Sequence, residues 1–178
     1  MIDRITIPPE KFNSNLFSLF SKQWMLLTAG DLAANEINTM TVSWGFLGYL
    51  WQRPVVMVLV RPQRWTMKFI EKHDTFTLSA FPETHRDALN LCGSQSGRDI
   101  NKIAAARLTP IESERIDAPG FAEAELIIEC RKLYADWIEP KGFIDKSFIN
   151  SIYPDADFHK IFIGGIENIS GISEYLNR

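Results

Sequence analysis

Two arginines and a threonine are closely spaced in the segment RPQRWT, which begins at Arg61 and ends at Thr66. The segment joins a predicted buried strand to a predicted helix, so Arg61, Arg64 and Thr66 flank one turn. Guanidinium groups bind phosphate in bidentate geometry, and the free N–H groups at a helix start favour an anion. The segment therefore predicts a phosphate site. The alternative interpretation is two solvated arginines and an ordinary threonine cap.

A second segment, NTMTVSWG, runs from Asn38 to Gly45 and places small polar residues at every second position. As a strand over 40–46 it carries Thr41, Ser43 and Gly45 on one face and larger apolar side chains on the other. Such a face lets a planar ligand lie close to the main chain. The alternative is an ordinary antiparallel strand with its polar side in water, which the segment taken alone favours.

The segment CGSQSGRD begins at Cys92 and is followed by Lys102. Its small residues permit tight turns that can expose main-chain N–H groups to an anion. It lacks the G-K-[ST] sequence of a P-loop, so we expect no nucleoside triphosphate site here. Cys92 has no activating base next to it, and we interpret it as a packed thiol and not as a nucleophile. A plain loop between two helices would explain the segment equally well.

The three histidines lack the spacing of metal ligands. His159 opens the last predicted strand, and a lone histidine is more often structural than catalytic. The sequence contains neither the G-x-S-x-G nor the H-E-x-x-H motif. We therefore expect neither a metal site nor a nucleophilic hydrolase.

These segments must be positioned by a fold that the pattern predicts to be mainly β with helical insertions. Strands are predicted over 24–28, 40–46, 55–61, 75–81, 125–137 and 159–166, and helices over 66–72, 84–92 and 99–107. A turn is predicted at Ala29-Gly30-Asp31, and a bulge or close backbone approach at Gly164-Gly165. Short strands separated by turn signals favour a β-barrel. A doubly wound α/β sheet is the alternative, disfavoured because helices and strands do not alternate regularly and no G-x-G-x-x-G motif is present.

The chain has 178 residues, a length that predicts a single domain over 1–178. Its 19 basic and 22 acidic residues give a formal charge of −3, which provides no strong field for nucleic acid or a membrane surface. The two isolated cysteines are typical of reduced thiols. There is no apolar run long enough for a membrane span and no signal-peptide pattern, so we expect a cytoplasmic protein. Five Trp and twelve Phe indicate either an aromatic core or surfaces that receive a flat ligand.

Taken in order, six motifs resemble the flavin reductase-like family, in particular its flavoredoxin-like branch. The motifs are N-x-MT-x-SWG from Asn38, RP-x-R-x-T from Arg61, FTLS from Phe76, CGS-x-SGRD-x-x-K from Cys92, ECRKLY from Glu129 and HKIFIG from His159. Each motif is weak alone, but together they extend from about residue 23 to residue 168 in a fixed order. The resemblance implies a split β-barrel that binds FMN in a groove at a homodimer interface.

The resemblance also implies roles for individual residues. The cofactor-binding residues would be Asn38, Met40, Thr41, Ser43, Trp44, Arg61, Arg64, Thr66, Ser96, Gly97 and Lys102. Among them, Arg61, Arg64 and Thr66 would hold the phosphate, and Lys102 would favour negative charge on the reduced flavin. His159 would lie near the flavin or nicotinamide and is the predicted catalytic residue. The family commonly has an acidic residue where this chain has Gly165, so we expect no assisting carboxylate there.

In function, the resemblance implies an oxidoreductase in which NADH or NADPH gives hydride to FMN. Electrons then pass to flavin, iron or a redox partner protein. Because the reactive atoms belong to the cofactor, the chain needs neither a catalytic triad nor a metal. Two alternatives stay open. One is an FMN-binding electron carrier or flavin store without nicotinamide activity; the other is a barrel for another phosphorylated planar ligand, such as a relative of pyridoxal phosphate.

Overall fold

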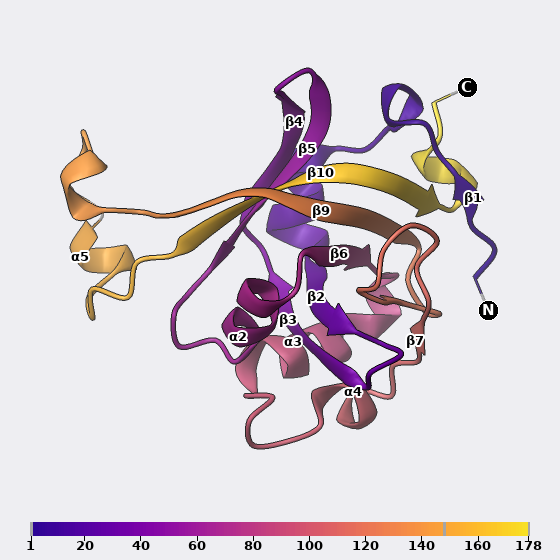
Figure 1. Ribbon diagram of the computed structural model, residues 1–178, viewed down its shortest axis with the longest axis horizontal. Helices are drawn as coiled ribbons and strands as arrows, with labels where there is room; N and C mark the ends of the chain where they lie inside the picture. The colour runs from indigo at the N-terminus through magenta and orange to yellow at the C-terminus, as the bar shows by residue number, and fades with distance from the viewer. Residues whose placement is uncertain (1, 148, 178) are drawn as a thin grey trace.

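The computed structural model describes residues 2–147 and 149–177, and these residues build an antiparallel sheet flanked by short helices (Figure 1). The strands of the main sheet are β1 (Ile5–Thr6), β2 (Met25–Asp31), β3 (Glu36–Val42), β4 (Gly45–Leu50), β5 (Arg53–Val60), β6 (Thr75–Ala80), β9 (Leu126–Trp137) and β10 (Lys160–Gly171). Their order is β3-β2-β6-β9-β10-β5-β4, with β1 paired to β10. A small separate ladder joins β7 (Pro110–Ile111) to β8 (Gly120–Phe121).

The helices are short and lie between the strands. They are α1 (Leu16–Ser18), α2 (Thr66–Lys72), α3 (Arg86–Ser94), α4 (Lys102–Ala105) and α5 (Ile149–Ile152), with a π-helical turn over Leu19–Gln23. In Figure 1, α2, α3 and α4 lie together below the sheet, whereas α5 belongs to an arm that projects to the left. None of the helices in the described ranges has the length and apolar character needed to cross a membrane.

The sheet curls until its first and last strands come together. β3 and β4 follow one another in the chain, yet they stand at opposite ends of the strand order. Because Ser43 and Trp44 alone separate these two strands, the ends of the sheet must meet there. The hydrogen-bonded pairings of the described residues include no β3–β4 ladder, so the barrel is split at this point. The predicted fold, mainly β with a split barrel and helical insertions, is confirmed.

The core is built by alternating side chains of the long strands. In β5, Val56, Val58 and Val60 have no exposed surface, and they alternate with the half-buried Met57 and Leu59. Side chains of successive strand residues point to opposite faces, so one face of β5 packs entirely into the core. This agrees with the buried strand predicted over 55–61.

Gly164 is the point at which β10 approaches the core most tightly. A Cβ atom on this glycine would lie 2.7 Å from the ring of Phe76 and 2.9 Å from the Cβ of Cys130. The pairing of β9 and β10 also shifts register between Ile163 and Gly164. The bulge or close approach predicted at Gly164-Gly165 is therefore confirmed.

The predicted strand over 40–46 is wrong, because β3 ends at Val42 and β4 begins at Gly45. Gly45 has a φ of 154°, and a Cβ atom there would lie 2.6 Å from the ring of Phe20. The ring of Phe20 fills the space beside this backbone, and only glycine fits the resulting conformation. The alternation of apolar residues continues through the break, which is why the pattern did not reveal it.

The turn predicted at residues 29–31 is also wrong, since β2 continues to Asp31. Gly30 has a φ of 126°, and a Cβ atom there would lie 2.0 Å from the carbonyl oxygen of Glu36. The glycine therefore permits a close contact between β2 and β3 inside the ladder. The turn itself follows over 32–35.

The helix predicted over 99–107 is shorter than expected. Helix α4 begins after Asn101, whose Oδ1 accepts a hydrogen bond of 3.1 Å from the main-chain N–H of Ala104. Asn101 is thus the N-cap, two residues after Asp99, the first residue of the predicted helix. The residues 95–101 remain a loop, which leaves them free to approach β3.

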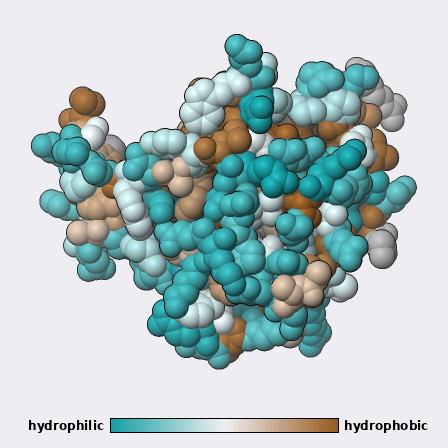
Figure 2. All heavy atoms as spheres, viewed as in Figure 1, coloured by the Kyte–Doolittle hydropathy of each residue, from teal (hydrophilic) through white to brown (hydrophobic). Residues whose placement is uncertain are grey.

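Strands β4 and β5 form a hairpin with exposed aromatic side chains. Its two turn residues, Trp51 and Gln52, have φ values of 51° and 59°, as in a type I′ turn. Tyr49 is 73% exposed and Trp51 54% exposed. In Figure 2 the upper tip of the molecule, in the region of this hairpin, is teal and white, with brown apolar atoms directly below it.

Candidate functional site

Two cationic side chains, Arg64 and Lys102, meet at the end of α3. The Arg64 guanidinium donates hydrogen bonds of 2.6 Å to the carbonyl of Gly93 and 3.2 Å to that of Cys92. The Lys102 ammonium donates to the same Cys92 carbonyl at 3.2 Å. Among the ion pairs of the described residues, none involves Arg64 or Lys102. Their charges are therefore balanced only by carbonyl oxygens.

Lys102 is only 4% exposed, which is rare for a lysine. Burial, together with the positive charge of Arg64, lowers the pKa of Lys102 to about 8. Burial likewise lowers the pKa of Arg64. An anion bound between these two groups would relieve both their desolvation and their mutual repulsion.

A pocket of about 530 Å³, here called the Lys102 pocket, is lined by Lys102 but not by Arg64. Its other lining residues include Asn38 of β3 and Gly97, Arg98 and Asp99 of the loop before α4. Asn38 donates a hydrogen bond of 2.7 Å from Nδ2 to the hydroxyl of Thr66. A Cβ atom on Gly97 would lie 2.2 Å from Oδ1 of Asn38, so the loop can approach this amide only with glycine at that position. Ser96, the neighbouring predicted residue, accepts a hydrogen bond of 3.2 Å from the main-chain N–H of Arg98.

Thr66 does not have the predicted capping role. The N-cap of α2 is Trp65, no side chain caps this helix, and Thr66 is its first residue. The hydroxyl of Thr66 is fully buried and accepts the hydrogen bond from Asn38. The threonine thus ties β3 to the start of α2 and fixes the wall of the Lys102 pocket.

The side chain of Arg61 binds the projecting arm, whereas that of Arg64 binds the end of α3. Its guanidinium forms an ion pair with Asp157 and donates a hydrogen bond of 2.9 Å to the carbonyl of Ile152. Gln63 donates to the same carboxylate at 2.6 Å. The hydrogen bonds from Arg61 and Gln63 lower the pKa of Asp157. The two arginines that the sequence places on one turn therefore have different environments, since the charge of Arg61 is already compensated.

A second hollow lies where the barrel is split, and we call it the Trp44 groove. It measures about 190 Å³ and is lined by Met40, Thr41, Val42, Ser43, Trp44, Leu59, Arg61 and His159. Thr41 turns its hydroxyl toward α3 and donates a hydrogen bond of 2.5 Å to the carbonyl of Leu89. Trp44 is 45% exposed, so its indole edges the groove on the solvent side.

His159 lies at the base of the Trp44 groove. Its ring is 5.2 Å from that of Trp44 and 5.5 Å from that of Tyr153, measured between centroids. Nδ1 of His159 is 2.9 Å from the hydroxyl of Tyr153. Burial, together with the positive charge of Arg61, lowers the pKa of His159 to about 4. The imidazole is therefore neutral at pH 7, with Nδ1 engaged and Nε2 free for a ligand.

β3 connects the two hollows. Asn38 lies in the Lys102 pocket, while Met40, Thr41 and Val42 of the same strand line the Trp44 groove. At about 3.3 Å per residue, Asn38 and Val42 are roughly 13 Å apart along the strand. The arrangement suits an elongated ligand with an anionic end at Arg64 and Lys102 and a flat end beside Trp44.

The sequence pattern of the flavin reductase like domain matches residues 17–177 of this chain. The chain belongs to the flavin reductase-like family. No match was found among curated protein sequences. The family membership agrees with the six sequence motifs and with the split sheet.

Solved structures of other flavin reductase-like proteins share the fold. A flavoredoxin of Desulfovibrio vulgaris (Miyazaki F) aligns with a TM-score of 0.66 and 22% identity over 91% of this chain and 75% of its own. The FMN-binding domain of a flavin reductases-like enzyme from Shewanella baltica OS155 aligns with a TM-score of 0.70 and 18% identity over 99% and 81%. A flavoredoxin from Methanosarcina acetivorans aligns with a TM-score of 0.66 and 22% identity over 93% of this chain and 76% of its own. The chain thus has the fold of the flavoredoxin-like branch of the family.

The sequence did not indicate two features of the site, Tyr153 and the ion pair of Arg61. Tyr153 lies six residues before His159 in the aromatic-rich segment of the arm, and this clustering of aromatic residues is the only signal in the sequence. Asp157 is distant from Arg61 in the chain, so no local pattern reports their contact.

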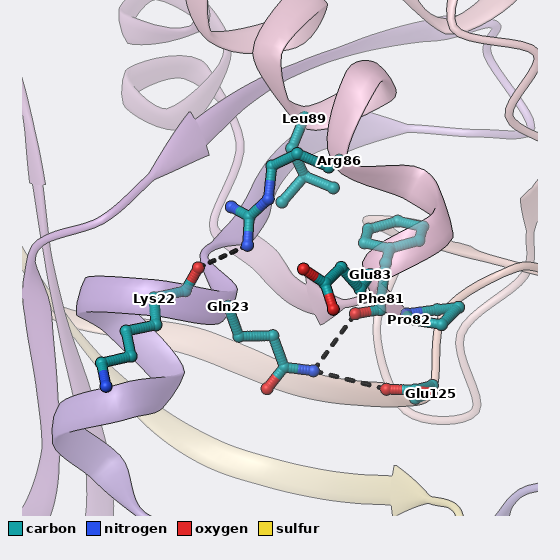
Figure 3. Close-up of a pocket in the computed structure, with 8 residues that line it drawn as sticks. All are labelled: Lys22, Gln23, Phe81, Pro82, Glu83, Arg86, Leu89 and Glu125. Carbon is teal, nitrogen blue, oxygen red and sulfur yellow. Dashed lines mark hydrogen bonds between the residues drawn. The ribbon is translucent and has the colours of Figure 1, made fainter.

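A further pocket lies away from both hollows, between the π-helical turn and the start of α3 (Figure 3). Its polar side chains donate hydrogen bonds to main-chain carbonyls and to Glu125. Gln23 donates hydrogen bonds of 3.2 Å to the carbonyl of Phe81 and 3.3 Å to Glu125, and Arg86 donates one of 2.5 Å to the carbonyl of Lys22. These contacts fasten the end of the π-helical turn to the rest of the molecule.

Proposed function

We propose that this protein binds FMN and acts as an oxidoreductase of flavin reductase type, with NADH or NADPH as the hydride donor. The observation that carries the proposal is the pair of cations, Arg64 and Lys102, which meet without a carboxylate partner among the described residues. A phosphate monoester carries about −1.5 to −2 charges and matches such a pair. In a member of the flavin reductase-like family, the natural anion with a flat end is FMN.

The residues of the Lys102 pocket fit a phosphate. Lys102 offers a charge in the lining, and Arg64 a second charge next to it, since both donate to the Cys92 carbonyl. Gly97 leaves room for close approach of the main chain. Asn38 and Thr66 supply further polar groups, already oriented by their mutual hydrogen bond. These residues would hold the phosphate end of the cofactor.

The residues of the Trp44 groove would hold the ring. When bound, FMN supplies hydride and electron transfer, and the protein supplies position and electrostatics. Trp44 provides a flat apolar surface, and the neutral His159 offers Nε2 without adding charge. His159 is therefore proposed to orient the ring or the nicotinamide, and not to act as an imidazolium acid at pH 7.

The exposed hairpin supports the proposal of a homodimer. Tyr49 and Trp51 are largely exposed, and the Trp51 ring lies 6.3 Å from that of Tyr134 on β9. Aromatic side chains grouped in this way are typical of protein interfaces. Sedimentation velocity of the protein and of Trp51→Arg tests this, since the substitution should shift a dimer toward monomer.

A cytoplasmic location is proposed on the state of the cysteines. Cys92 and Cys130 are buried free thiols, and burial raises the pKa of each. Such thiols are typical of a reducing compartment. Electrons would pass from the flavin to free flavin, iron or a redox partner protein of that compartment.

The deciding experiment is anaerobic mixing of the FMN-loaded protein with NADH and, separately, with NADPH. Bleaching of the flavin absorbance by either donor is the expected result. The similarity to two flavoredoxins favours an electron carrier as the second candidate. A carrier would bind FMN yet stay coloured with both donors, and would bleach only with dithionite. Absence of FMN binding would contradict both functions and leave another phosphorylated planar ligand as the alternative.

A further inference from the structure

A third hollow, which we call the Phe20 pocket, lies between the N-terminal segment and the start of β4. It measures about 960 Å³, and its lining includes Phe17, Phe20, Ser43, Trp44, Gly45 and Phe46. The lining contains four aromatic side chains and no charged one. This volume is at the upper end of that of small-molecule sites, which are mostly apolar with a few polar groups.

The N-terminal wall of this pocket is held in an unusual conformation. The residues Leu19–Gln23 form a π-helical turn, and the next residue, Trp24, has a φ of 64°. Both features are uncommon for ordinary residues and occur preferentially at functional sites. They place the ring of Phe20 against the backbone of Gly45, where a Cβ atom would lie only 2.6 Å away.

This conformation is fastened from the opposite side, as Figure 3 shows. Gln23 donates hydrogen bonds to the carbonyl of Phe81 and to Glu125, and Arg86 donates to the carbonyl of Lys22. The guanidinium of Arg86 also lies 4.4 Å from the centre of the Trp24 ring. These contacts anchor the C-terminal end of the π-helical turn that carries Phe20 and Ser21 into the pocket lining.

Aromatic side chains of the pocket lining are exposed to solvent. Trp44 is 45% exposed, Phe46 53% and Phe17 88%. An aromatic ligand seated between these rings would bury apolar surface on both sides and could stack against them. A ligand with phosphate or carboxylate groups would find no cation in the lining, so a nicotinamide dinucleotide fits poorly.

The Phe20 pocket is continuous with the Trp44 groove, since Ser43 and Trp44 line both. We propose that the Phe20 pocket binds an uncharged aromatic molecule at the edge of the proposed flavin site. Binding itself requires no flavin; only the placement beside the cofactor rests on the proposed function. The indole of Trp44 then separates two ligands, the flavin ring in the groove and the aromatic molecule in the pocket.

The test uses two probes of the same shape, naphthalene-2-carboxamide and the anionic naphthalene-2-carboxylate, titrated calorimetrically into the full chain. The carboxamide should bind at least about tenfold more tightly than the carboxylate. Phe46→Thr should lower the affinity for the carboxamide by about fivefold or more, because it removes one aromatic side chain from the lining. Leu50→Thr is the control on the same strand, outside the pocket, and should change the affinity by less than about twofold.

Nuclear Overhauser contacts between the naphthalene protons and the Phe46 ring should accompany binding. Equal binding of the two probes, or equal effects of the two substitutions, would overturn the proposal. The proposal would also be overturned if the unsubstituted chain did not bind the carboxamide and Phe46→Thr no longer formed a dimer. That result would assign the Phe20 pocket to the contact with a second copy of the chain. FMN affinity is measured on the same samples. If the protein binds FMN but not the carboxamide, only the proposal for the Phe20 pocket is refuted. If it binds the carboxamide but not FMN, only the proposed function is refuted.

Discussion

The hydroxyl of Tyr153 lies 2.9 Å from Nδ1 of His159, and this contact ties the projecting arm to the floor of the Trp44 groove. Tyr153 is only 6% exposed and is itself packed against Phe158, at 4.6 Å between ring centres. Arg61 completes the cluster, with its guanidinium 5.3 Å from the centre of the Tyr153 ring. The orientation of His159 therefore depends on the arm as well as on β10.

Tyr153→Phe should release Nδ1 of His159 while keeping the aromatic packing. We expect a mixture of imidazole tautomers in place of one, visible in ¹⁵N chemical shifts of the histidine ring at pH 7. The lost hydrogen bond should lower the free energy of unfolding by about 1 kcal/mol. Unchanged ring shifts would mean that Tyr153 does not fix the tautomer.

The lowered pKa of His159 predicts a pH dependence of stability. Its pKa falls from the ordinary 6.5 to about 4 because of burial, so between these values the unfolded chain binds more protons. Stability should then be full above about pH 6.5 and decline as the pH falls toward 4, by on the order of 2–3 kcal/mol. His159→Gln should remove this part of the slope in urea titrations, whereas His85→Gln, at the start of α3, should retain it. An identical slope in all three proteins would refute the assignment.

Arg64→Ala and Arg61→Ala should have different effects, although the two residues share one turn. Arg64 has no carboxylate partner among the described ion pairs, so its loss should weaken FMN binding roughly 10- to 100-fold. Arg61 is bound to Asp157, so its loss should mainly loosen the arm, seen as faster amide exchange over 152–158. Flavin fluorescence quenching measures the affinities. Equal losses of affinity would show that both arginines contact the phosphate, as the sequence alone predicts.

The sequence was sufficient for features that depend on local pattern. The valines of β5 alternate with less buried residues, and their strand was predicted nearly at its true bounds. The break at Gly45 was missed because it depends on the ring of Phe20, which lies far away in the chain. The separation of Arg61 from Arg64 has the same cause, since Asp157 reaches Arg61 only through the fold. The burial of Lys102 likewise results from packing that no periodicity reports.

Because the pKa of Lys102 is lowered, we expect the affinity for FMN to depend on pH. Its pKa is lowered from 10.5 to about 8, mainly by burial, so the ammonium loses its proton in the range where an exposed lysine keeps it. The affinity for an anionic phosphate should fall as the pH rises through about 8. Lys102→Met should weaken binding at pH 7 and abolish this fall, while Lys11→Met, at an exposed position, should change neither. A fall that persists in Lys102→Met would assign the titration to another group.

Gly97→Ala tests the close approach of the loop to β3. The added Cβ would lie 2.2 Å from Oδ1 of Asn38 and 3.1 Å from the Trp65 ring, so the loop must move away. We expect a loss of about 1–3 kcal/mol in the free energy of unfolding and weaker FMN binding, because the Lys102 pocket loses its shape. The matched control is Gly142→Ala, where no atom lies within 4 Å of the added Cβ, and it should change stability by less than about 0.5 kcal/mol.

Thermal unfolding with and without FMN separates the two effects of Gly97→Ala, on stability and on FMN binding. A purely structural role would lower the melting temperature but leave the FMN-induced increase intact. Loss of that increase in Gly97→Ala alone would locate the cofactor at this loop.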